Sequence, residues 1–306
     1  MVEANYTVAF EFVLLGFTTS QDLQVMCFVL FLATYVVTLL GNLGVITLIR
    51  LDSCLHTPMY FFLSHLSLLD VCYSSTIIPQ TLLNFLVEKK VISFSRCATQ
   101  LFFFAACANT ECYVLAAMAY DRYVAVCNPL LYPMVMSQRL CSGMLAGAYL
   151  AGVISSTVHT ISIFRLPFCL SKRINHFFCD GPPLLALSCS DTRVNQVMLS
   201  AMVGFNVLST TVFILMSYSL VLSTILRLPS AAGWYKAFST CASHLVSVAL
   251  YYGSCLFVYL HSSPLEDRQS LEHNKVGSVL YSVVVPMLNP LIYSLRNTDM
   301  KNAMRK

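Results

Sequence analysis

Met118–Pro133 reads MAYDRYVAVCNPLLYP and places an acid and a base side by side at the end of a long apolar segment. A charge at bilayer depth costs roughly 2.5–3.5 kcal/mol on insertion scales, so Asp121 and Arg122 mark either a functional site or a membrane boundary. The apolar run stops within a few residues, and Pro129 and Pro133 break any continuing helix. The stretch therefore predicts the end of a membrane-spanning helix.

The composition of the whole chain is that of an integral membrane protein. Hydrophobic residues make up 57% of the 306 positions and charged residues only 10%, whereas soluble domains carry about 25% charge. The charges cluster between apolar stretches of roughly 20 residues, which is the length of one bilayer crossing. The net charge of +4 forms no basic stripe, so nucleic acid is excluded as a partner.

The apolar stretches predict an all-α membrane protein, a bundle of seven transmembrane helices in a single domain of residues 1–306. The expected spans are 24–49, 58–83, 97–127, 141–164, 194–226, 237–261 and 272–295. Outside them lie an N-terminal tail (1–23), a long second outer loop (165–193) and a short C-terminal tail (296–306). An odd number of spans puts the two termini on opposite sides of the membrane.

The orientation follows from the flanks of the first span. Lys and Arg are tied at nine on each side over the whole chain. However, no base precedes the first span and Arg50 follows it, which favours an extracellular N-terminus and a cytoplasmic C-terminus. The sequon Asn5-Tyr6-Thr7 agrees and predicts glycosylation at Asn5.

Polar residues inside the spans must face other helices. Asn42 needs a partner within the bundle, and Asp70 and Glu111 are expensive at mid-span. The two acids indicate either a Na⁺ or proton site or a neutral carboxyl in an interhelical hydrogen bond. As an alternative function they could line the pathway of an ion- or solute-translocating protein, although we find no inverted repeats. No nucleophile–base or metal-ligand constellation indicates an enzyme.

Four of the 13 cysteines fall on the outer side: Cys97, Cys169, Cys179 and Cys189. An even number in an oxidising compartment predicts two disulfides, with three connectivities open. His176-Phe177-Phe178-Cys179-Asp180 also has the spacing of metal ligands, but a disulfide at Cys179 would remove its thiolate.

Six motifs in order along the chain resemble those of rhodopsin-like (class A) G-protein-coupled receptors, and specifically odorant (olfactory) receptors of the tetrapod-type class II. They are Gly41-Asn42, Leu55–Leu63 (LHTPMYFFL), Met118–Tyr123 (MAYDRY), Ser217-Tyr218, Lys236–Cys241 (KAFSTC) and Pro286–Tyr293 (PMLNPLIY). The chain departs from the family pattern at Trp234, where a basic residue is usual, and this change bears on the strength of G-protein coupling.

The resemblance implies roles for particular residues. Disulfides Cys97–Cys179 and Cys169–Cys189 are expected, and Arg122 is expected to meet the G protein with Tyr218 and Tyr293 as its active-state partners. Asp121, Tyr123 and His244 complete this coupling set; His244, near the inner face, is either a buried hydrogen-bonding residue or a hinge contact. No cofactor is expected apart from a Na⁺ ion at Asp70, Glu111 and Asn289.

The resemblance and the helical spacing together predict a ligand pocket in the outer half of the bundle. On the third span Phe104, Ala105, Ala108 and Asn109 share one face, and Tyr252 matches the family's toggle position on the sixth. The full set is Phe104, Ala105, Ala108, Asn109, Met202, Val203, Asn206, Tyr252, Cys255, Leu256, Tyr259, Ser278 and Ser282. This mostly apolar face suits a small, neutral, volatile odorant.

The implied partners are an odorant, membrane lipid and a stimulatory, olfactory-type G protein that raises cyclic AMP. The implied location is the plasma membrane of olfactory sensory neuron cilia, as a multi-pass protein that is not an enzyme.

Overall fold

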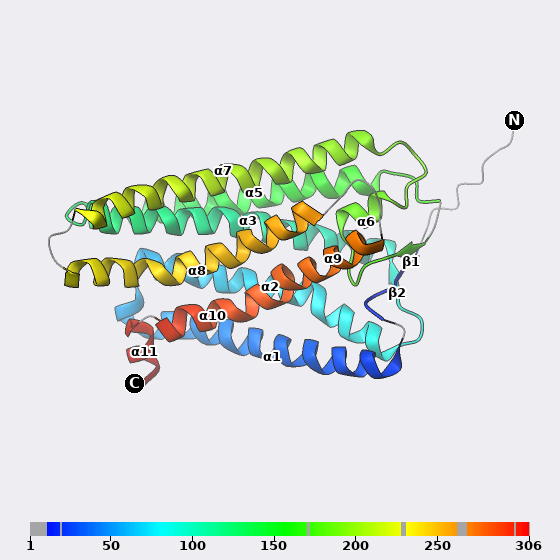
Figure 1. The fold of residues 1–306 in the computed structure, drawn as a ribbon, viewed down its shortest axis with the longest axis horizontal. Helices are drawn as coiled ribbons and strands as arrows, with labels where there is room; N and C mark the ends of the chain where they lie inside the picture. Colours follow the sequence, from blue (N-terminus) through cyan, green and yellow to red (C-terminus); the bar gives the residue numbers. More distant parts are fainter. Residues whose placement is uncertain are drawn as a thin grey trace, which may run out of the picture.

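The computed structural model describes residues 11–18, 20–169, 172–227, 231–261, 268–296 and 298–305. Within these ranges seven helical segments are long and apolar enough to cross a membrane, as predicted. Figure 1 shows them side by side in one bundle. Six are single helices: α1 (Gln21–Leu51), α2 (Pro58–Leu86), α3 (Phe94–Cys127), α5 (Gln138–Phe164), α7 (Arg193–Leu226) and α8 (Ala231–His261). The seventh is built from α9 (Arg268–Val279), the π-helical turn η2 (Leu280–Val284) and α10 (Val285–Arg296).

Helix α3 forms the centre of the bundle. In its most apolar window 67% of the residues are buried, against 11% for α1 and 17% for α7. It contacts α2, α5, α7 and α8. Polar residues on α3 are therefore surrounded by protein, whereas most of α1 and α7 faces outward.

The seventh span is held to α1 through a defect that proline creates. Pro290 has no N–H, so the carbonyl four residues earlier, at Pro286, loses its helical partner. The Asn42 side chain replaces it by donating its Nδ2–H to the Pro286 carbonyl at 3.0 Å. A Cβ atom at Gly41 would lie 2.8 Å from Pro290 Cγ, so only glycine admits this approach. The prediction that Asn42 faces other helices is confirmed.

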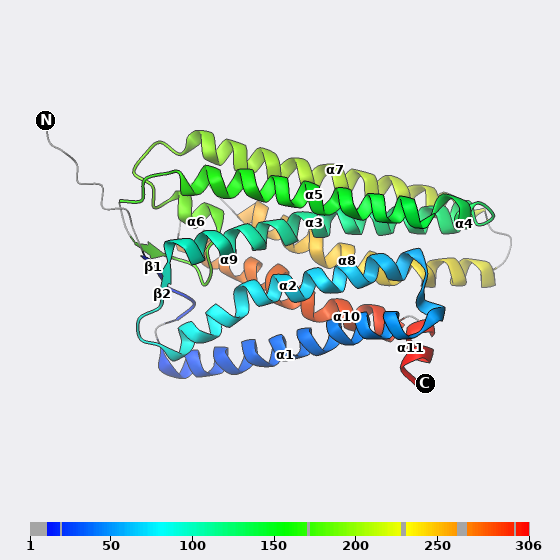
Figure 2. The same cartoon turned by 180° about the vertical axis from the view of Figure 1, so that it is seen from behind.

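Short elements close the cytoplasmic end of the bundle, at the right of Figure 2. They are η1 (Ser53–Leu55), α4 (Tyr132–Val135) and α11 (Thr298–Arg305). In α11, Met300 is fully buried, and Asp299 Oδ2 accepts a hydrogen bond of 3.3 Å from the Tyr60 hydroxyl. The tail after the seventh span is thus anchored to α2.

A three-stranded sheet and α6 (Gly181–Leu185) close the extracellular end. The strands β1 (Glu11–Leu14), β2 (Val91–Ser93) and β3 (Arg173–Ile174) lie in the order β2-β1-β3, with β1 antiparallel to β2 and parallel to β3. The sequence did not predict this sheet. Its central strand comes from the segment that was expected to be an N-terminal tail.

Candidate functional site

The Asp121–Arg122 pair is buried at the cytoplasmic end of α3. Asp121 is fully buried and Arg122 is 8% exposed. Asp121 Oδ2 accepts a hydrogen bond of 3.1 Å from Arg122 Nε and a second, shorter one from Nη2. Arg122 is thus held by its own neighbour and does not project from the bundle to meet a G protein.

Tyr132 completes this site, and sequence reasoning missed it although it lies within the opening stretch. The chain turns after α3, and α4 brings the Tyr132 hydroxyl back to donate to Asp121 Oδ1 at 2.7 Å. Burial and the Asp121 carboxylate raise the pKa of the Tyr132 phenol, which therefore keeps the proton that it donates. The signal that could have found it is the Tyr132-Pro133 pair, because proline is favoured in a helix's first turn.

His244 joins three helices one layer deeper. Its Nε2 lies 3.0 Å from the Leu115 carbonyl on α3, and its Nδ1 lies 2.6 Å from the Tyr218 hydroxyl on α7. A carbonyl only accepts, so Nε2 carries the proton and the Tyr218 hydroxyl donates to Nδ1. Of the two readings of His244, the buried hydrogen-bonding residue is the one that this geometry matches. Tyr123 packs on the nearby cluster of Val221, Ile225 and Cys241, and Tyr293 is 1% exposed.

The two mid-span acids are buried in the bundle interior, as predicted. Asp70 is 1% exposed and Glu111 3%. Asn289 Nδ2 donates to both Asp70 oxygens, at 3.0 and 3.3 Å. The buried Asn289 Oδ1 has no hydrogen-bond partner in the structure. Two carboxylates and a spare amide oxygen fit a hard cation. Among the residues described, no group of three or more His, Cys, Asp or Glu could hold a metal ion.

Above these acids, a polar cluster links the predicted pocket residues Asn109, Asn206 and Tyr252. Asn206 Nδ2 donates to Asn109 Oδ1 at 2.5 Å, and Asn206 Oδ1 accepts from the Tyr113 hydroxyl at 2.7 Å. The Tyr252 hydroxyl on α8 donates to Thr210 Oγ1 on α7 at 2.8 Å. The side chains that would recognise a polar group on a ligand therefore bond to one another across α3, α7 and α8.

Aromatic rings fill the outer end of the bundle around Phe104. Its ring centroid lies 5.3 Å from Tyr73, 4.9 Å from Phe178 and 6.1 Å from Tyr281. Phe178 belongs to the second outer loop, and Tyr73 and Tyr281 lie on α2 and in η2. None of these three was in the predicted set. Phe178 was missed because a loop's position over a bundle does not follow from helical spacing. Tyr73 and Tyr281 were missed because the predicted set took no residue from the second span and only Ser278 and Ser282 from the seventh.

The predicted pocket residue Ser278 connects this aromatic cluster to the loop. Ser278 Oγ lies 3.2 Å from His176 Nε2 and accepts from the Tyr281 hydroxyl at 3.1 Å. The Ser282 hydroxyl donates to the Ser278 carbonyl at 2.5 Å, within its own helix. Burial and the nearby Lys275 lower the pKa of His176 to about 3, so this imidazole is neutral.

Two pocket predictions are wrong. Val203 is 42% exposed and Leu256 is 56% exposed, so both lie on the outer surface of the bundle. Each follows a partly buried predicted residue, Met202 and Cys255 respectively, and successive residues are turned about 100° around a helix axis. Ala105 is buried and Ala108 partly buried, and their place in the ligand pocket stays a prediction. Asn5 lies outside the described residues, as do the side chains of Tyr259 and Trp234.

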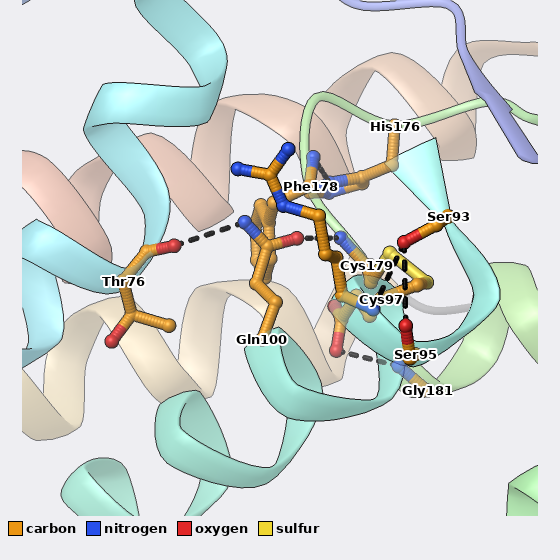
Figure 3. Close-up of a disulfide and its surroundings, with 11 residues drawn as sticks. Thr76, Ser93, Ser95, Cys97, Gln100, His176, Phe178, Cys179 and Gly181 are labelled. Carbon is orange, nitrogen blue, oxygen red and sulfur yellow. Dashed lines mark hydrogen bonds between the residues drawn. A yellow bond between two sulfur atoms is a disulfide. The ribbon is translucent and has the colours of Figure 1, made fainter. Parts of the chain in front are cut away.

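The second outer loop is fastened over the site by the two expected disulfides. Cys97–Cys179 and Cys169–Cys189 are both present, with Cα separations of 5.6 and 5.8 Å. In Figure 3, Gln100 lies between the loop and α2: its Oε1 accepts from the Cys179 amide at 2.9 Å and its Nε2 donates to the Thr76 carbonyl at 3.0 Å. Because Cys179 is in a disulfide, its thiolate is lost to any metal site with His176.

The path of the chain matches a known receptor structure. It is similar to squid rhodopsin with a TM-score of 0.77 at 16% identity, over 94% of this chain and 81% of that one. Seven helices in this arrangement, with a buried acid–base pair at one end of the third, give the chain the fold of rhodopsin.

Sequence comparison gives the family. The family model for "Olfactory receptor" matches residues 31–306. Human olfactory receptor 5AU1 is 53% identical over all of this chain and 84% of its own length. Mouse olfactory receptor 5AP2 is 53% identical over 99% of this chain and 94% of its length.

The chain belongs to the olfactory receptor family. It is a multi-pass membrane protein whose family implies an odorant ligand and a G-protein partner. Olfactory receptors are signalling receptors and not enzymes. Membership of this family also argues against the alternative function, an ion- or solute-translocating protein that uses Asp70 and Glu111.

Proposed function

We propose that this receptor binds a small, neutral, mostly apolar volatile molecule in the outer half of the bundle. We further propose that it activates a stimulatory, olfactory-type G protein, raises cyclic AMP and works in the cilia of olfactory sensory neurons. The observation that supports this class of ligand is the set of side chains that line the proposed site. Aromatic and small side chains at Phe104, Ala105 and Ala108 lie beside a few neutral polar groups at Asn109 and Asn206.

Apolar burial sets the scale of the affinity. Burying apolar surface contributes about 25 cal/mol per Å², and micromolar binding corresponds to roughly −8 kcal/mol. A small volatile molecule has little apolar surface beyond the area whose burial gives this binding free energy. The expected half-maximal odorant concentration is therefore micromolar.

The proposed mechanism is a population shift read out at Arg122. Tyr252 ties α8 to Thr210 on α7, and its hydroxyl also lies 3.4 Å from the Cys112 carbonyl on α3. An odorant that packs better when this tie is broken favours an arrangement in which the inner end of α8 moves outward. It does so only by its differential affinity for the two arrangements. Arg122 then leaves Asp121 and meets the G protein, with Tyr218 and Tyr293 as new neighbours.

We also propose that Asp70, Glu111 and Asn289 hold a Na⁺ ion. The unpaired oxygen of Asn289, a residue whose Nδ2 binds the Asp70 carboxyl group, supports this assignment. Such an ion would compensate buried negative charge between α2, α3 and α10.

A panel of chemically diverse odorants in a cyclic AMP reporter cell tests the function. Arg122→Ala should abolish the response at matched surface expression. Ala108→Met, which fills the inner face of α3, should raise the half-maximal odorant concentration about tenfold or more, because overpacking costs about 1–3 kcal/mol. Val203→Met is the matched control, because Val203 lies on the outer surface of α7. Equal shifts in the two variants would refute the pocket. A response that persists in cells lacking stimulatory Gα subunits would refute the G-protein type.

A further inference from the structure

The N-terminal strand β1 lies across the extracellular mouth of the bundle as the middle strand of its sheet (Figure 1). Side chains alternate between the faces of a sheet. Phe12 and Leu14 are fully buried on the inner face, together with their cross-strand partners Ile92 and Ile174. Glu11 points to the other face and is exposed. The sheet therefore presents an apolar inner surface to the bundle, and its outer surface carries the exposed Glu11.

Ring contacts continue from this segment into the ligand region. Phe17, just after β1, stacks on Phe177 at a centroid distance of 4.7 Å. Phe177 lies 4.8 Å from Phe178, which lies 4.9 Å from Phe104 on α3. The N-terminal segment is thus in direct packing contact with the roof of the proposed odorant site.

Among the described residues, β1 is the strand that lies outside the connections between consecutive helices. Strand β2 joins α2 to α3, and β3 lies in the loop that the disulfides at Cys169 and Cys179 hold at both ends. Strand β1 precedes α1 and is joined to it through the segment on its C-terminal side. Its attachment includes four backbone bonds, in which the amides of residues 13–16 donate to carbonyls of Lys172, Lys90, Ile174 and His176 at 2.7–3.2 Å.

We propose that Glu11–Phe17 is a lid, and that an odorant reaches the outer half of the bundle when this segment lifts from β2, β3 and Phe177. The inference deepens the proposed function, on which it rests, by assigning the route by which a ligand reaches the site. Gly16 is the hinge. Its φ is +66° and its amide donates to the His176 carbonyl at 3.2 Å. That conformation is one that L-residues rarely adopt.

The closed lid can be weakened at Gly16 without changing any side-chain contact. A Cβ added at Gly16 meets nothing within 4 Å, so Gly16→Ala acts through the backbone alone. Gly253→Ala on α8 is the matched control, because a Cβ there also meets nothing within 4 Å and its φ is not positive. We expect Gly16→Ala to increase the lifted population by about 5- to 30-fold, and Gly253→Ala to leave it unchanged.

Thiol labelling on intact cells measures that population directly. Leu14→Cys puts a thiol on the fully buried inner face of β1, where a membrane-impermeant maleimide reacts only after the lid lifts. Its labelling rate should rise about 5- to 30-fold when Gly16→Ala is added and stay constant when Gly253→Ala is added. Equal rates in the two double variants would overturn the lid. No odorant is needed, so the measurement does not depend on the proposed ligand or G protein.

A reversible lock tests whether lifting admits the odorant. Val13 and Val91 are direct cross-strand partners, and opposed antiparallel residues have Cα separations of about 4.5–5.5 Å, within the range of a disulfide. The pair Val13→Cys and Val91→Cys should form a bond that closes the lid. The odorant response should then fall at least about tenfold, and an impermeant reductant should restore it. Each single variant, with and without reductant, controls for the native disulfides.

A locked receptor that responds like its reduced form would overturn the route. Conversely, a receptor whose Leu14→Cys labelling follows Gly16→Ala, but in which none of the odorants in the panel raises cyclic AMP, supports the lid and overturns the proposed function.

Discussion

Tyr132→Phe removes one hydroxyl from the cytoplasmic site and leaves the ring in place. In the structure that hydroxyl donates to Asp121 Oδ1 at 2.7 Å, while Oδ2 of the same carboxylate holds Arg122. A hydrogen bond to a charged group contributes about 1.5–3 kcal/mol. Tyr132 is partly exposed, so the lower end, about 1.5 kcal/mol, is the appropriate figure.

That free energy belongs to the arrangement in which Arg122 is held. If α4 releases Asp121 when the G protein binds, the loss falls on the closed arrangement alone. About 1.4 kcal/mol is a tenfold change in an equilibrium constant, so the open population, and with it ligand-independent signalling, should rise about tenfold while it remains the minor state.

The assay is basal cyclic AMP, or basal G-protein dissociation, without odorant at matched surface expression. Tyr149→Phe is the control, because it also removes a phenol hydroxyl, one that lies 3.4 Å from His65 Nδ1 and does not contact Asp121. Adding Arg122→Ala should cancel the rise, since signalling then lacks its contact. An unchanged or lower basal signal in Tyr132→Phe would refute the proposal that this hydroxyl holds the closed state.

Three further predictions concern stability, each measured by thermal unfolding of the detergent-solubilised receptor. Burial raises the pKa of Asp180, in the second outer loop, to about 6, above its ordinary 3.8. The folded state then binds more protons than the unfolded state between those values, so stability falls as pH rises through this window. Asp180→Asn should gain up to about 2–3 kcal/mol over the parent between pH 4 and pH 6, and a difference independent of pH would contradict this. Gly41→Ala should destabilise by about 1–3 kcal/mol because its Cβ would meet Pro290, whereas Gly44→Ala, where a Cβ meets nothing within 4 Å, should not; equal melting temperatures would show that the contact relaxes. His244→Phe leaves a buried carbonyl and a phenol hydroxyl without their hydrogen-bond partner and should destabilise the fold by about 1–3 kcal/mol. A Phe variant with the melting temperature of the parent would contradict this prediction.

The helices were predictable because a segment that crosses lipid must satisfy its backbone hydrogen-bonding groups internally, and its side chains must be apolar. Membrane-spanning helices therefore appear in the sequence as long apolar runs. Most ends of the seven predicted spans agree with the ends of the seven helices to within a few residues. The motifs supplied the family and the disulfide pairs for a similar reason, since each is a local stretch of residues. Even Asn42 was readable, because a mid-span amide must find a partner.

The errors and omissions arise where the packing of the whole bundle, and not the local sequence, decides where a side chain lies. Whether Val203 or Leu256 faces the pocket depends on how α7 and α8 are rotated within the bundle, and an apolar side chain suits lipid and protein interior equally well. Phe178 lies in the second outer loop and Tyr132 in the short helix α4 between two spans. The paths of such connections leave no periodicity in the sequence. Strand β1 was missed for the same reason, since its partners lie in two distant loops.

In Met118–Pro133, some features follow from the sequence alone and others only from the tertiary structure. The sequence by itself determined that Asp121 and Arg122 end a span and that Pro129 and Pro133 stop the helix, because charge and proline act locally. Only the tertiary structure decided that Tyr132 returns to bind Asp121 and that Arg122 is held back from the cytoplasm. That outcome depends on where α3 and α4 come to lie, which the packing of the whole bundle sets.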